Sequence, residues 1–108
     1  MMKPISVWKQ ELSGGAHAAR LAALYCCAPE QTPAQADRYE AVLDGLEATF
    51  GPHAEAGLYS APGRTEIGGN HTDHQHGRVL AGSVNIDMIA AAGPNTLGQL
   101  RVQSEGYD

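Results

Sequence analysis

One short stretch of this chain concentrates the side chains that can do chemistry. Residues 60–80 read SAPGRTEIGGNHTDHQHGRVL and place arginines, a glutamate, an asparagine, an aspartate and three histidines between two apolar runs. Burying such groups without partners is costly, because each loses its hydrogen bonds to water. Four glycines in the same stretch let backbone approach a ligand closely. The composition favours a binding site for a polyol or a phosphate.

The second half of this stretch suits a sugar, whose neighbouring hydroxyls both donate and accept hydrogen bonds. A carboxylate such as Asp73 can accept from two hydroxyls at once, and His71 and Asn70 can donate and accept at a third. Arg64 adds a permanent cation that can stabilise an alkoxide or a phosphoryl group during transfer.

Metal binding is an alternative for the same residues. His71, Asp73, His74 and His76 lie within six positions, and all are potential zinc ligands. Asp73 and His74 are adjacent, so their side chains would diverge in an extended segment, and the stretch lacks the helical His-Glu-x-x-His pattern. We therefore predict no metal site.

Charge and hydropathy argue against several other classes of protein. The 108 residues carry a net charge of −5 without a Lys/Arg run, which is atypical of a nucleic-acid surface or a polybasic membrane anchor. No apolar stretch approaches the roughly 20 residues that span a bilayer. The N-terminus lacks the apolar core of a signal peptide. We expect a cytoplasmic protein with a small-molecule sugar as its partner.

The elements that must position these residues are helices followed by strands. Apolar spacing predicts helices over residues 5–13 and 16–27, and a third that begins at Pro33 and ends at Gly51-Pro52. Short β-like runs follow at residues 57–61, 78–81, 85–92 and 99–104. This order predicts an α+β arrangement. Asp87, inside one of these runs, is expected to be exposed or hydrogen-bonded rather than a catalytic base.

The run APGRTEIGGNHTDHQHGRVL over residues 61–80 closely resembles the galactokinase motif, in which Gly-Arg leads into Ile-Gly, an acidic residue, His, any residue and Asp. Galactokinases belong to the small-molecule kinases named for galactose, homoserine, mevalonate and phosphomevalonate. The resemblance is strong over residues 61–80 and extends plausibly over residues 50–92.

The resemblance implies a role for each matching residue. Arg64 matches the catalytic arginine near the anomeric hydroxyl and the transferred phosphate. His71 matches a residue that binds the primary hydroxyl, and Asp73 matches the carboxylate that binds the hydroxyls at carbons three and four. Asn70 stands where the family has Glu. Two further candidates also depart from the motif, since Glu66 replaces Asn and His74 replaces Tyr.

The resemblance also implies a fold and a reaction. Residues 1–49 would be a helical lead-in, and residues 50–108 the opening strands of a galactokinase-type N-terminal domain, of the ribosomal S5 domain 2-like fold in the full protein. The full enzyme would use ATP and Mg²⁺ to convert galactose to galactose 1-phosphate. The Gly/Ser-rich ATP loop has no counterpart here, so we expect this segment to bind the sugar without ATP, and to be inactive alone.

Two alternatives stay open. The chain could be a stand-alone sugar-binding or regulatory module, or part of a kinase for another sugar such as N-acetylgalactosamine or arabinose. The expected strands would also leave sheet edges unpaired, so self-association through those edges is an expectation of the sequence.

Overall fold

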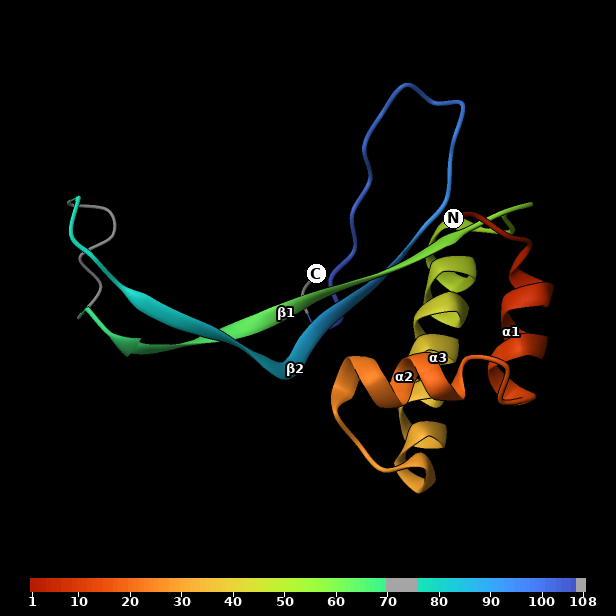
Figure 1. Ribbon diagram of the computed structural model, residues 1–108. Helices are drawn as coiled ribbons and strands as arrows, with labels where there is room; N and C mark the ends of the chain where they lie inside the picture. Colours follow the sequence, from red (N-terminus) through yellow and green to blue (C-terminus); the bar gives the residue numbers. More distant parts are fainter. Residues whose placement is uncertain (70–75, 107–108) are drawn as a thin grey trace.

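The computed structural model describes residues 1–69 and 76–106, in which helices precede a single β-hairpin (Figure 1). The elements in order are the helices α1 (Ile5–Ser13) and α2 (Ala18–Tyr25), a 3₁₀ turn η1 (Pro29–Gln31), helix α3 (Thr32–Phe50), and the strands β1 (Gly57–Gly68) and β2 (Leu80–Ala92). The predicted α+β arrangement is confirmed.

Local signals explain where the longest helix begins and ends. Pro33 stands in the first turn of α3, where its fixed φ suits a helix and its missing N–H is not needed. At the other end Gly51 adopts φ +83°, and its N–H donates to the carbonyl of Glu47 at 2.9 Å. Glycine takes this positive-φ conformation without strain, so the helix stops there.

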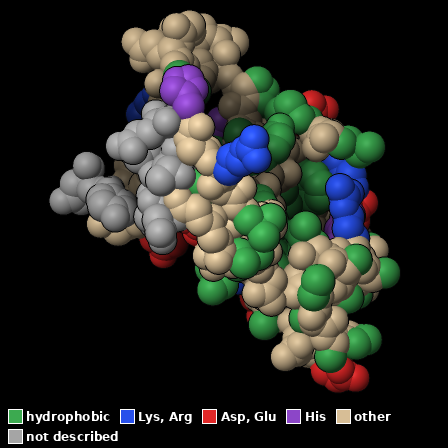
Figure 2. Space-filling model, turned by 60° about the vertical axis from the view of Figure 1, so that its left-hand side comes forward, with side chains coloured by type: hydrophobic (Ala, Val, Ile, Leu, Met, Phe, Trp, Pro, Cys, Tyr) green, Lys and Arg blue, Asp and Glu red, His purple; other side chains and the backbone are tan. Residues whose placement is uncertain are grey.

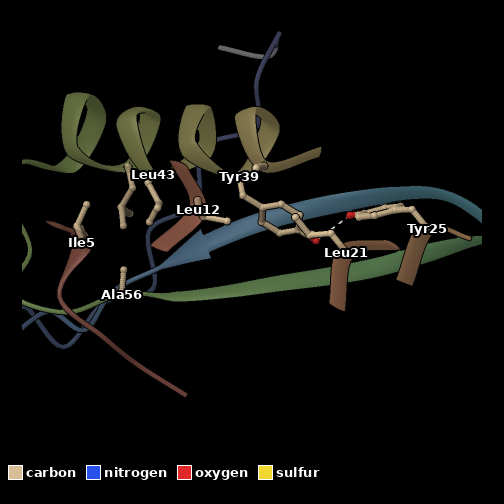
Figure 3. Packing of buried hydrophobic residues seen from close by; sticks show 9 residues of the cluster. Ile5, Leu12, Leu21, Tyr25, Tyr39, Leu43 and Ala56 are labelled. Carbon is tan, nitrogen blue, oxygen red and sulfur yellow. Dashed lines mark hydrogen bonds between the residues drawn. The ribbon is translucent and has the colours of Figure 1, made fainter. Parts of the chain in front are cut away.

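The hydrophobic core lies between the helices and the part of the hairpin next to them (Figure 3). Leu43 of α3 is fully buried at its centre. The other buried apolar residues come from α1, α2, α3 and the segment before β1; they are Ile5, Leu12, Leu21, Tyr25, Ala36, Tyr39, Leu46 and Ala56. Trp8 packs against this cluster and donates its indole N–H to the carbonyl of Ala56 at 2.7 Å, which fixes α1 to the start of the hairpin.

The hairpin is antiparallel, with pairs running from Gly57↔Ala92 to Gly68↔Leu80. Between Pro62↔Asp87 and Arg64↔Ser83, β1 advances by two residues while β2 advances by four, so residues 84–86 bulge out of the ladder. A bulge bends its strand and increases the local twist. In Figure 1 the hairpin accordingly starts beside the helices and carries its far end well away from them.

The four predicted strands differ from the two that the structure contains. The runs at residues 78–81 and 85–92 merge into β2, and the strand predicted at residues 57–61 continues to Gly68, which places Arg64 and Glu66 in a strand rather than a loop. Residues 99–104 form no strand. A strand needs a pairing partner, and in this segment Arg101 instead lies over the ring of Phe50, 5.1 Å from its centroid.

A buried carboxylate joins the helices to the hairpin. The side chain of Asp87 on β2 is only 3% exposed, and it accepts hydrogen bonds from Tyr25 at 2.5 Å, Ser60 at 2.5 Å and Arg38 at 3.0 Å. Because the Tyr25 hydroxyl donates to Asp87, the Tyr39 hydroxyl, 2.7 Å away, must donate to Tyr25. Helices α2 and α3 and both strands therefore meet at one charged group.

This arrangement shifts the pKa of Asp87. Burial alone would raise the pKa, but the hydrogen bonds from Ser60, Tyr25 and Arg38 stabilise the carboxylate more strongly and lower it. A carboxyl group with a lowered folded-state pKa stabilises the fold above its unfolded pKa, about 3.9 for Asp. That stabilisation is lost as the pH falls through the folded pKa.

We therefore expect the free energy of unfolding to decline as the pH is lowered below about 4, and Asp87→Asn to remove this part of the decline. At neutral pH the same variant should lower the free energy of unfolding by roughly 1.5–3 kcal/mol, the range for hydrogen bonds to charged groups. Urea unfolding over the acid range measures both effects. Asp44→Asn is the control, since this carboxylate is 65% exposed in its pair with Lys9 and should change little. Identical pH profiles for Asp87→Asn and the parent would contradict the expectation.

Candidate functional site

The structure places part of the predicted site on β1. Arg64 pairs with Ser83 and Glu66 with Ala81, so both residues stand on β1. This strand leads into residues 69–79, the remaining part of the polar sequence and called the polar stretch below. Arg64 is exposed and Glu66 half-buried. The predicted sugar contacts Asn70, His71 and Asp73, and the further candidate His74, lie outside the described residues.

Arg64 and Glu66 share one face of the hairpin. Alternate residues of a strand point to the same side, so Ser60, Pro62, Arg64 and Glu66 follow one another along the face that contacts Asp87 nearer the helices. Among the residues that the structure describes, no ion pair neutralises Arg64. Its guanidinium is therefore an accessible cation on the strand that enters the polar stretch.

Gly69 shapes the entry to that stretch. Its φ is +117°, and a Cβ at this position would lie 2.6 Å from Cγ1 of Val79 and 2.7 Å from the carbonyl oxygen of Arg78. Both distances are too short for real contacts, so only glycine fits where β1 passes the start of β2. Gly68 is different, because a Cβ there would meet nothing within 4 Å.

Within the described ranges, no group of three or more His, Cys, Asp or Glu side chains could hold a metal ion. Of the four residues considered as zinc ligands, the structure describes His76 alone, which is exposed with φ +60°.

On the face shown in Figure 2, lysine, arginine and acidic side chains are scattered among hydrophobic ones rather than gathered by sign. In the described part of the chain, no helix is both long and apolar enough to cross a bilayer.

Residues 46–94 match a family model described as the galactokinase galactose-binding signature. This part of the chain carries that signature. The match confirms the resemblance read from residues 61–80, and it extends from the end of α3 through both strands to Pro94. No curated protein and no solved structure matches the chain.

The signature thus coincides with the hairpin, and the helices before residue 46 lie outside it. Sequence reasoning proposed Arg64 and the polar stretch as candidates but did not connect Asp87 with Tyr25 and Arg38. Arg38 lies 49 positions before Asp87 in the chain, so no local pattern relates the two. The one signal in the sequence was an acidic residue inside an apolar run, because such a residue is rarely buried unless it has a partner.

We expect Gly69→Ala to alter the backbone where the two strands meet, because alanine is strained at φ +117° and its Cβ collides with Val79. The amide resonances of Arg78 and Val79 should shift in ¹H–¹⁵N spectra. Gly68→Ala is the matched control and should leave these resonances close to those of the parent. Equal spectra for the two variants would show that the strands meet differently.

Proposed function

We propose that residues 46–94 bind galactose as the sugar-recognising part of a galactokinase, a cytoplasmic enzyme that transfers the γ-phosphate of ATP to the anomeric hydroxyl and gives galactose 1-phosphate. The observation that carries this proposal is the galactose-binding signature, which spans the hairpin bearing Arg64 and the polar stretch at its end.

The sugar contacts in this proposal come from the stretch that follows β1. Asp73 accepts hydrogen bonds from the hydroxyls at carbons three and four, and His71 and Asn70 bind the primary hydroxyl. The axial hydroxyl at carbon four distinguishes galactose from glucose, so Asp73 is the main specificity residue. Glu66 and His74 are further candidates for polar contacts with the sugar.

Arg64 is the catalytic residue of the proposal. Its exposed guanidinium stands on β1, six residues before Asn70, within the same signature. A fixed cation beside the transferring phosphoryl group stabilises the negative charge that moves during transfer.

We propose that this segment does not itself bind ATP. Phosphates are commonly cradled by a Gly-rich loop at a helix N-terminus. The loop before α2 contains Gly14 and Gly15 but lacks the run of serines that such a phosphate-binding loop has in this family. We assign no residue of this segment to ATP or Mg²⁺ and derive no step that passes through them.

Asp73→Ala should weaken galactose binding by about tenfold or more, because the specificity carboxylate is lost. Isothermal titration calorimetry on the 108-residue chain, with galactose and glucose offered separately, measures this loss. Asp37→Ala, an exposed carboxylate on α3, is the matched control and should bind like the parent. Galactose binding that survives in Asp73→Ala, or equal binding of glucose by the parent, would contradict the assignment.

Arg64→Ala in the product of the complete gene should lower kcat by about 10²–10³ with a smaller change in KM, since the cation acts mainly on the charge of the transition state. ADP release in the presence of galactose, N-acetylgalactosamine or arabinose measures it. Arg101→Ala, on the segment after β2, is the control. If the folded parent releases ADP with none of these sugars, the enzyme proposal is wrong and a sugar-binding module remains.

A further inference from the structure

The hairpin has an inner half that packs against the helices and an outer half that extends beyond them (Figure 1). In the inner half, Leu58, Ile89 and Ala91 are partly buried against the core. Residues 61–65 of β1 are exposed, as are Leu80, Ala81 and Ser83 on β2. The outer half carries Arg64, so its direction relative to the helices decides where that guanidinium stands.

The last residue of α2 holds the hairpin at the boundary between these halves. The Tyr25 hydroxyl donates to the Asp87 carboxylate at 2.5 Å, while the Tyr25 backbone carbonyl accepts from the Asn85 side-chain amide at 3.2 Å. Asn85 and Asp87, which are two positions apart on β2, thus bind the backbone carbonyl and the side-chain hydroxyl of the same tyrosine. Such a pair of bonds restrains rotation of the strand as well as its distance from α2.

The same boundary is the point where β2 bends. Asn85 lies at the centre of the bulge of residues 84–86, and Asp87 pairs with Pro62 at its inner edge. A bulge re-aims the strand that follows it. Because Asn85 is bonded to α2 from inside the bulge, the helix fixes the position of the bend.

Arg64 lies directly beyond this bend. Ser60, which donates to Asp87 at 2.5 Å, and Arg64 are on the same face of β1 and four residues apart, roughly 13 Å at 3.3 Å per residue. A small change of angle at the bulge therefore displaces Arg64.

We propose that Tyr25, Asn85 and Asp87 are positioning residues that set the direction of the hairpin arm bearing Arg64. This inference rests on the proposed function of residues 46–94. It assigns a functional role to the C-terminus of α2, which lies outside the matched signature.

The test measures the direction of the arm by double electron–electron resonance. Spin labels are placed at Ala41→Cys on α3 and Thr65→Cys on β1, two exposed positions. The native thiols are replaced by Cys26→Asn and Cys27→Ala; asparagine tolerates the left-handed backbone of Cys26, whose φ is +49°. Galactose affinity of each variant is measured in parallel, at a temperature where circular dichroism shows it folded.

Asn85→Ala and Asp87→Asn are the test variants, and Tyr39→Phe is the matched control. Tyr39→Phe removes a buried hydroxyl from the same network, 2.7 Å from Tyr25, without touching the hairpin. Asn85 is exposed, so its truncation should leave the fold intact even if Asp87→Asn unfolds.

The proposal expects a shifted or broadened distance distribution in Asn85→Ala and Asp87→Asn, with galactose affinity about tenfold lower. Tyr39→Phe should keep the parent's distribution and affinity. Unchanged distances in folded Asn85→Ala and Asp87→Asn would overturn the proposal, and so would a displaced arm that binds galactose as the parent does. A parent chain that does not bind galactose would count against the proposed function; the distances alone would then decide whether these residues direct the arm.

Discussion

The structure depends on the burial of one negative charge. Moving a carboxylate out of water is costly unless it is paired and hydrogen-bonded. Asp87 meets this condition through a cation on α3, a phenol on α2 and a hydroxyl on β1. Each of these partners comes from a different element, so the charge is satisfied only when α2, α3 and the hairpin are assembled together.

The two halves of the hairpin are therefore held by different forces. The inner half is fixed by the Asp87 network and by apolar contacts of Leu58 and Ile89 with the core. The outer half is fixed by strand pairing, by the bulge at residues 84–86 and by the steric demand for glycine at position 69. This division puts Arg64 on an arm that extends from a packed base, and functional residues are often carried on segments that a rigid scaffold positions.

How far the sequence predicts this molecule depends on the range of the interactions. Helix α1 occupies the residues predicted for it, because apolar spacing and Gly14-Gly15 define it locally. Strand β1 was predicted too short: Pro62 and Gly63 are residues that strands locally disfavour, yet pairing with β2 carries the strand through them. The candidate Arg64 follows from its motif, whereas the Asp87 network joins residues up to 62 positions apart and leaves no local pattern.

The central claim is that the hairpin and its polar stretch form a galactose site. The most direct test is a ¹H–¹⁵N titration of the 108-residue chain with galactose, read residue by residue. The account predicts shifts concentrated at Arg64, Glu66 and residues 69–80, with the amides of α1 unchanged. Shifts confined to the helices, or none at galactose concentrations that saturate known binders, would contradict it.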